Sequence, residues 1–153
     1  MAVTKTILKN TNNETVIKVA GTSGGATIDL QTDCLASTQA LDGATQTVNI
    51  AGCQWVGLAT ASITITRNSV NVLTLPGGGA DSIDFAAGSG YVDTTENTSD
   101  IIVNIAGAEA QLYLILRKVG GYATKVETAV YGAYDDVTRV GASTTLSGSP
   151  DKV

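Results

Sequence analysis

The chain has 153 residues, only 15% of them charged, and its formal net charge is −5. A chain of this length is expected to form one domain with a core of its own. The acidic balance argues against nucleic-acid binding, which depends on clustered lysine and arginine, and against docking on anionic membranes. The longest apolar runs, such as Leu112–Leu116, are far shorter than the ~20 residues that span a bilayer.

The composition favours β-structure. Threonine, valine and isoleucine are abundant, and their branching at Cβ suits a pleated sheet better than a helix. No stretch of ten residues shows the i, i+3, i+4 apolar spacing of an amphipathic helix, so we expect less than ~10% helix. The low charge indicates that much of the surface contacts other protein.

The first part of the chain predicts short strands separated by polar or glycine-containing loops. One pair flanks the sequence KNTNNE, with strands near Thr6–Leu8 and Thr15–Val19. Further strands are expected at Ala26–Leu30, Thr45–Ile50 and Cys53–Leu58.

A β-hairpin is predicted over residues 61–75. Apolar and polar residues alternate from Ala61 to Thr66, which places successive side chains on opposite faces of a strand. Asn68 and Ser69 follow at the position of a tight turn, because Asn tolerates positive φ. Leu73 and Leu75 fall out of phase with Val70 and Val72, which indicates a bulge.

After short strands at Ser82–Phe85 and near Tyr91–Val92, a second hairpin is predicted. Ile101–Ile105 supplies its first strand, a turn forms around Gly107, and Ala110–Arg117 returns. The returning strand is apolar on both faces, which is typical of a central strand covered on both sides. We expect these strands and the first hairpin to share a core of Ile63, Ile65, Val103, Ile105, Leu112, Leu114 and Leu116.

Eight to ten short strands of this kind predict an all-β fold, a β-sandwich or jelly roll, with an extended terminal arm. We place the sandwich in residues 1–122. Residues 123–153 have strand propensity but little continuous alternation, and they end in a stretch rich in Ser, Thr and Gly. They form either an edge strand with a frayed tail or an arm that orders on a neighbouring subunit. In the second case the interface residues are Val130, Tyr131, Tyr134 and Val137.

The sequence indicates binding rather than catalysis. It contains no histidine, which excludes Ser-His and Cys-His pairs and histidine metal sites. The acidic groupings are Asp81 with Asp84, the trio Asp93, Glu96 and Asp100, and Asp135 with Asp136. They lie in loop-like segments where solvated acids are expected, and the trio does not have EF-hand spacing. We therefore predict no catalytic residue, no metal site and no cofactor.

Cys34 and Cys53 are too few for a disulfide framework or a zinc site. Free, buried thiols are favoured, with a disulfide between them as the alternative in an oxidising environment. Trp55 follows Cys53 in a strand-like stretch and is interpreted as a core side chain rather than a sugar-binding platform.

The chain as a whole is similar to small virion proteins of tailed bacteriophages, especially those of phages that infect marine cyanobacteria. The stretch ASITITRNSVNVLTLPGGGADSIDFAAGSGYVDTTENTSDIIVNIAG carries most of this resemblance, which extends over residues 54–122. It implies a capsid decoration (cement) protein that binds the major capsid protein or other virion subunits and assembles with itself, often as a trimer. The first ten residues lack the apolar region of a signal peptide, so we expect synthesis in the host cytoplasm and residence in the virion.

Two alternatives stay open. The chain is also compatible with a neck, tail or fibre-attachment component of such a particle. From a different class, it is compatible with a carbohydrate-binding or adhesin β-sandwich, which should carry several exposed aromatic side chains on one face.

Overall fold

The computed structural model describes residues 2–85 and 95–125, and every regular element within these ranges is a β-strand. The expected all-β class is therefore confirmed. These ranges contain eleven strands: β1 (Thr4–Asn10), β2 (Glu14–Gly21), β3 (Gly24–Ile28), β4 (Gln39–Leu41), β5 (Thr47–Gly57), β6 (Ser62–Arg67), β7 (Val70–Pro76), β8 (Gly79–Asp84), β9 (Ile101–Ala106), β10 (Ala110–Gly120) and β11 (Tyr122–Thr124).

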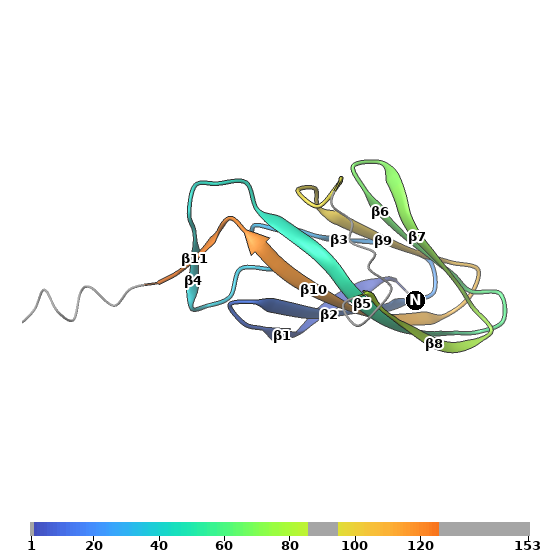
Figure 1. The fold of residues 1–153 in the computed structure, drawn as a ribbon. Coiled ribbons are helices and arrows are strands. Elements are labelled where there is room, and N and C mark those ends of the chain that lie inside the picture. The colour runs from blue at the N-terminus through green and yellow to red at the C-terminus, as the bar shows by residue number, and fades with distance from the viewer. Residues whose placement is uncertain (1, 86–94, 126–153) are drawn as a thin grey trace, which may run out of the picture.

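Two sheets face each other, and a two-stranded ribbon of β4 and β11 stands at one end (Figure 1). The larger sheet has the order β1-β2-β10-β5-β8 and the smaller one β3-β9-β6-β7. Four antiparallel pairs, β2–β10, β3–β9, β5–β8 and β6–β7, are nested in the chain. This nesting is the jelly-roll arrangement, with β1 added at one edge.

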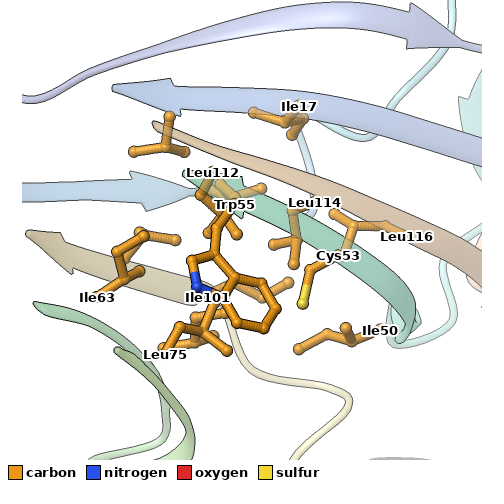
Figure 2. Close-up of a cluster of buried hydrophobic side chains, with 14 of the residues drawn as sticks. Ile17, Ile50, Cys53, Trp55, Ile63, Leu75, Ile101, Leu112, Leu114 and Leu116 are labelled. Atoms are coloured by element: carbon orange, nitrogen blue, oxygen red, sulfur yellow. The ribbon is translucent and has the colours of Figure 1, made fainter. Parts of the chain in front are cut away.

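The core lies between the sheets. All seven residues expected there are at most 1% exposed; Ile63, Ile65, Val103 and Ile105 come from the smaller sheet and Leu112, Leu114 and Leu116 from the larger. Trp55 lies among them (Figure 2) and donates a hydrogen bond from Nε1 to the Pro76 carbonyl oxygen over 2.9 Å. Its role as a core side chain is confirmed.

The predicted hairpin is formed by β6 and β7. Asn68 and Ser69 have φ values of 48° and 63°, as a turn whose twist matches the two strands requires. The register passes from Ile65–Leu73 to Thr66–Asn71, which leaves Val72 as the extra residue of a bulge. The phase change seen in the sequence therefore has this bulge as its cause.

The second predicted hairpin is wrong. β9 pairs with β3 and β6, whereas β10 pairs with β2 and β5, so the turn around Gly107 carries the chain from one sheet to the other. Gly107 has a φ of 85°, and a Cβ there would lie 2.1 Å from the Thr60 carbonyl oxygen. The alternation of apolar residues determines which face of each strand is buried but not which strand lies next to it. Two consecutive strands that lie in opposite sheets therefore have the same sequence pattern as the two strands of a hairpin.

β10 is a central strand, as expected, but only one of its faces is buried. Leu112, Leu114 and Leu116 point into the core, whereas Tyr113 and Ile115 are half-buried on the outer face. The two strands expected at residues 45–50 and 53–58 form the single strand β5, with a register shift at Ala51. The segment near Tyr91–Val92 lies outside the described residues. The short strand β11 overlaps the start of the segment for which an edge strand was one of two interpretations, whereas β4 was not predicted from the sequence.

Candidate functional site

Three adjoining hollows lie along the outer face of the larger sheet, and we call them together the outer groove. Their volumes are about 350, 390 and 560 Å³. The first two share Gln54 and Ser82, and the second and third share Glu14 and Arg117. The groove therefore runs from Val56 and Ala80 at one end to the neighbourhood of Lys118 at the other.

The middle of the groove exists because of a glycine. Gly52 lies between Ile115 of β10 and Asp84 of β8 in the sheet register. It has no side chain to fill the space between them, and a Cβ at this position would lie 2.8 Å from the Ile83 carbonyl oxygen. The close approach of β8 to β5 thus requires glycine here, and the same glycine leaves the hollow open.

Charge is distributed unevenly along the outer groove. One end is lined by Lys9, Arg117 and Lys118 with the single acid Glu14, which forms an ion pair with Lys9 at 2.7 Å. No hydrogen bond or ion pair joins the Arg117 guanidinium to another residue in ranges 2–85 and 95–125. This end therefore presents a cation with no partner in the described part of the chain.

The other end of the groove is apolar. Val56 is 44% exposed there, beside Tyr113 and Ala80. The Lys18 ammonium lies 5.9 Å from the centre of the Tyr113 ring. Tyr113 is the one aromatic ring that projects from this face in the described residues, because Trp55 points into the core.

The β4–β11 ribbon determines where the C-terminal part of the chain leaves the sandwich. Thr124 pairs with Gln39 and accepts a hydrogen bond from Asn12 Nδ2 at 3.2 Å. The Lys125 amide donates to the Thr38 carbonyl oxygen over 2.9 Å. The boundary expected between residues 122 and 123 falls within β11, and the described fold continues to Lys125.

A polar cluster around Lys118 supports this ribbon. Lys118 Nζ donates to Asn10 Oδ1 at 2.8 Å, to the Thr11 carbonyl at 2.8 Å and to Gln39 Oε1 at 2.6 Å. It also lies 5.1 Å from the centre of the Tyr122 ring. Burial lowers the pKa of Lys118 and raises that of the Tyr122 hydroxyl, which donates to the Leu30 carbonyl. These bonds connect the ribbon to the loop between β1 and β2.

Both cysteines are free and buried, as favoured from the sequence. Burial raises the pKa of each thiol from 9.0 to about 11. A nucleophilic thiol needs the opposite shift, because the thiolate is the reactive form. The arrangement is that of structural rather than reactive cysteines.

Two acids of the trio singled out in the sequence, Glu96 and Asp100, accept hydrogen bonds that stabilise loops and do not form an acidic cluster. Asp100 Oδ1 accepts the Leu30 amide at 3.0 Å, and Glu96 Oε1 accepts Asn68 Nδ2 at 3.0 Å. Asp93 lies outside the described residues, as do Asp135 and Asp136. Ranges 2–85 and 95–125 contain no group of three or more potential metal-binding side chains.

Arg67 is a buried charge that the sequence analysis missed. It is 0% exposed and donates to the carbonyl oxygens of Val48 at 2.7 Å, Asn97 at 3.0 Å and Ser99 at 2.7 Å. A signal existed, because Arg67 continues the inward phase of Ile63 and Ile65. Its function is to hold the loop before β9 against β5.

The predicted interface residues Val130, Tyr131, Tyr134 and Val137 lie outside the described residues. In the part of the chain that is described, no helix has the length and apolar character needed to cross a membrane. A scan against protein-family models and searches of curated proteins and solved structures found no match to this chain.

Proposed function

We propose that this protein is a structural component of a bacteriophage particle, a capsid decoration (cement) protein that binds the outer shell and stabilises it. The proposed place in the virion rests on the resemblance of the sequence to small virion proteins of tailed bacteriophages. The proposed mode of attachment rests on one observation. The Lys125 amide is hydrogen-bonded to the Thr38 carbonyl oxygen, and the sequence continues beyond this point through residues 126–153. A rigid sandwich with a chain leaving at a defined point is suited to attach itself to neighbouring subunits with that chain.

The sandwich offers a second feature suited to attachment. Within the described residues β7 and β8 are edge strands, each paired on one side only. An edge strand can accept an added strand from another protein, whose main-chain hydrogen bonds provide affinity. Each such contact is modest because ordering a segment costs entropy, but repetition around a symmetric particle multiplies it.

The copy number in purified particles tests the proposal. Decoration predicts a band on a denaturing gel with an intensity comparable to that of the major shell protein. A handful of copies per particle would indicate a neck, tail or fibre-attachment component instead. Absence of the protein from particles would refute a virion role.

Truncation tests the mode of attachment. Because Ala123 and Thr124 belong to β11, the chain should be ended after Lys125 rather than before Ala123. The truncated protein is expected to unfold at the same urea concentration as the full chain but to bind particles weakly. Full binding by a folded truncated protein would place the contact elsewhere, for example on β1 or the glycine-rich loops.

A further inference from the structure

The outer groove has the dimensions and chemistry of a site for an extended polypeptide. The outward residues of β10 that follow it are Gln111, Tyr113, Ile115 and Arg117, spaced by two. From Gln111 to Arg117 is about 20 Å, the length of a six- or seven-residue strand. Gln54 and Ser82 lie at its middle, and their amide and hydroxyl groups can bond to the backbone of a bound strand.

We propose that the outer groove binds residues 130–136, VYGAYDD, of a second copy of this chain. The inference rests on the proposed function, in which the residues after Lys125 attach the protein to its neighbours. It names one partner for that segment, which is another molecule of the same protein, and the site that receives it.

The alternate residues of this segment match the groove position by position. With Asp136 at Arg117, Tyr134 lies over Ile115 and Gly52, where the hollow of about 390 Å³ accepts its ring. Gly132 then lies over Tyr113, whose ring occupies the space of a side chain. Val130 falls at Gln111, beside the exposed Val56, which pairs with it in the sheet.

The polar groups are complementary in the same register. Asp136 supplies a carboxylate for the Arg117 guanidinium, a pair that can form two parallel hydrogen bonds. The Tyr134 hydroxyl is a donor near Asp84, which is opposite Gly52 in the register. The basic end of the groove therefore receives the acidic end of the segment.

In this register residues 130–136 cannot bind in the outer groove of their own molecule, because the chain that connects them to Lys125 is too short. The chain leaves the sandwich at the ribbon, which Lys118 fastens through Gln39, and β11 lies at the end of the molecule opposite β8 (Figure 1). To bind in its own groove, the chain would have to place Val130 at Gln111. Lys118 and Gln111 are seven strand residues apart, about 23 Å, whereas the five residues from Lys125 to Val130 reach at most about 18 Å. Only another copy can supply the segment.

Disulfide trapping between two variants of the full chain, each with one added cysteine, tests this directly. Gln111→Cys and Val130→Cys are mixed and oxidised, and a covalent heterodimer is expected on a non-reducing gel. Cys34 and Cys53 do not compete because they are buried. Thr64→Cys on the outer face of the smaller sheet is the matched control and should give no heterodimer with Val130→Cys. Equal trapping at positions 64 and 111, or none at 111, would overturn the proposal.

Charge exchange provides a second measurement. Arg117→Glu and Asp136→Lys should each weaken self-association about tenfold in sedimentation equilibrium, since each leaves like charges opposed. An equimolar mixture of the two variants should recover association, because the groove of the Arg117→Glu variant can receive the segment of the Asp136→Lys variant with the two charges exchanged. If neither variant changes the oligomeric state, the register is wrong.

The two proposals fail in different ways. Absence of the trapped heterodimer, together with loss of particle binding on truncation after Lys125, would reject the second copy as partner and leave the decoration role intact. A trapped heterodimer formed by a protein that is absent from particles would support the groove as a self-association site and refute the virion role.

Discussion

Arg67 donates a 2.7 Å hydrogen bond from Nη1 to the carbonyl oxygen of Val48, although its side chain is fully buried. The same guanidinium bonds to Asn97 and Ser99, so one charged group joins β5, β6 and the loop that precedes β9. The Asn97 carbonyl oxygen also accepts the Val48 amide at 2.9 Å, so Arg67 reinforces a backbone contact between β5 and this loop.

Replacing Arg67 with Met should lower the free energy of unfolding by about 2–5 kcal/mol, because the change removes the hydrogen bonds that the guanidinium donates to the carbonyls of Val48, Asn97 and Ser99. Urea denaturation measures the effect. Arg117→Met, at an exposed position of β10, is the matched control and should change stability by less than about 0.5 kcal/mol. Similar values for the two variants would show that the Arg67 bonds contribute little.

Leu114 tests the core. It is 0% exposed, so Leu114→Ala should cost about 2–5 kcal/mol through lost burial and the cavity left behind. Ile115→Ala, at the next residue of the same strand but on the outer face, should cost clearly less. A near-neutral result at Leu114 would contradict the assignment of the buried face of β10.

A substitution of Lys118 tests whether its hydrogen bonds stabilise the β4–β11 ribbon. Lys118→Met keeps most of the apolar stem but removes the three donors that bond to Asn10, Thr11 and Gln39. We expect the amides of Thr124 and Lys125 to exchange with deuterium at least about tenfold faster, while those of β10 near Leu114 change little. Lys9→Met, which removes only a surface ion pair, is the control; if it accelerates exchange equally, Lys118 has no special role.

Alkaline pH should destabilise the fold. The pKa of Cys34 and of Cys53 is about 11 in the folded protein against 9.0 as the ordinary value, because burial disfavours the thiolate. Their contribution to stability is fully present below pH 9 and is lost as the pH rises to about 11. The raised pKa of Tyr122 acts in the same direction above pH 10, whereas the lowered pKa of Lys118 acts in the opposite one.

For Cys34 alone the loss between pH 9 and pH 11 is about 2 kcal/mol. Urea midpoints measured from about pH 7.5 to about pH 10.5 should therefore be constant at first and then fall. Cys34→Ala should make the decline shallower. A midpoint that rises over this range would mean that Lys118 outweighs the thiols.

Local alternation in the sequence determined which side chains face the core. The inward positions of Ile63, Ile65, Val103 and Ile105 were predicted from a period of two, which depends only on the geometry of a strand. Asn68 and Ser69 identified a turn because few residues adopt positive φ, and the phase change at Leu73 revealed the bulge. Each of these predictions needed only residues close together in the chain.

Only the tertiary structure decided how the strands are arranged. β9 and β10 face each other instead of pairing, because alternation specifies a buried face and leaves the neighbouring strand open. The burial of Arg67 depends on carbonyls at Asn97 and Ser99, some thirty residues away. In the same way, the groove at Gly52 exists because β5, β8 and β10 come together there, and the ribbon at Thr124 because β4 lies beside it. These features arise from contacts between distant parts of the chain, and such contacts cannot be predicted from local sequence patterns.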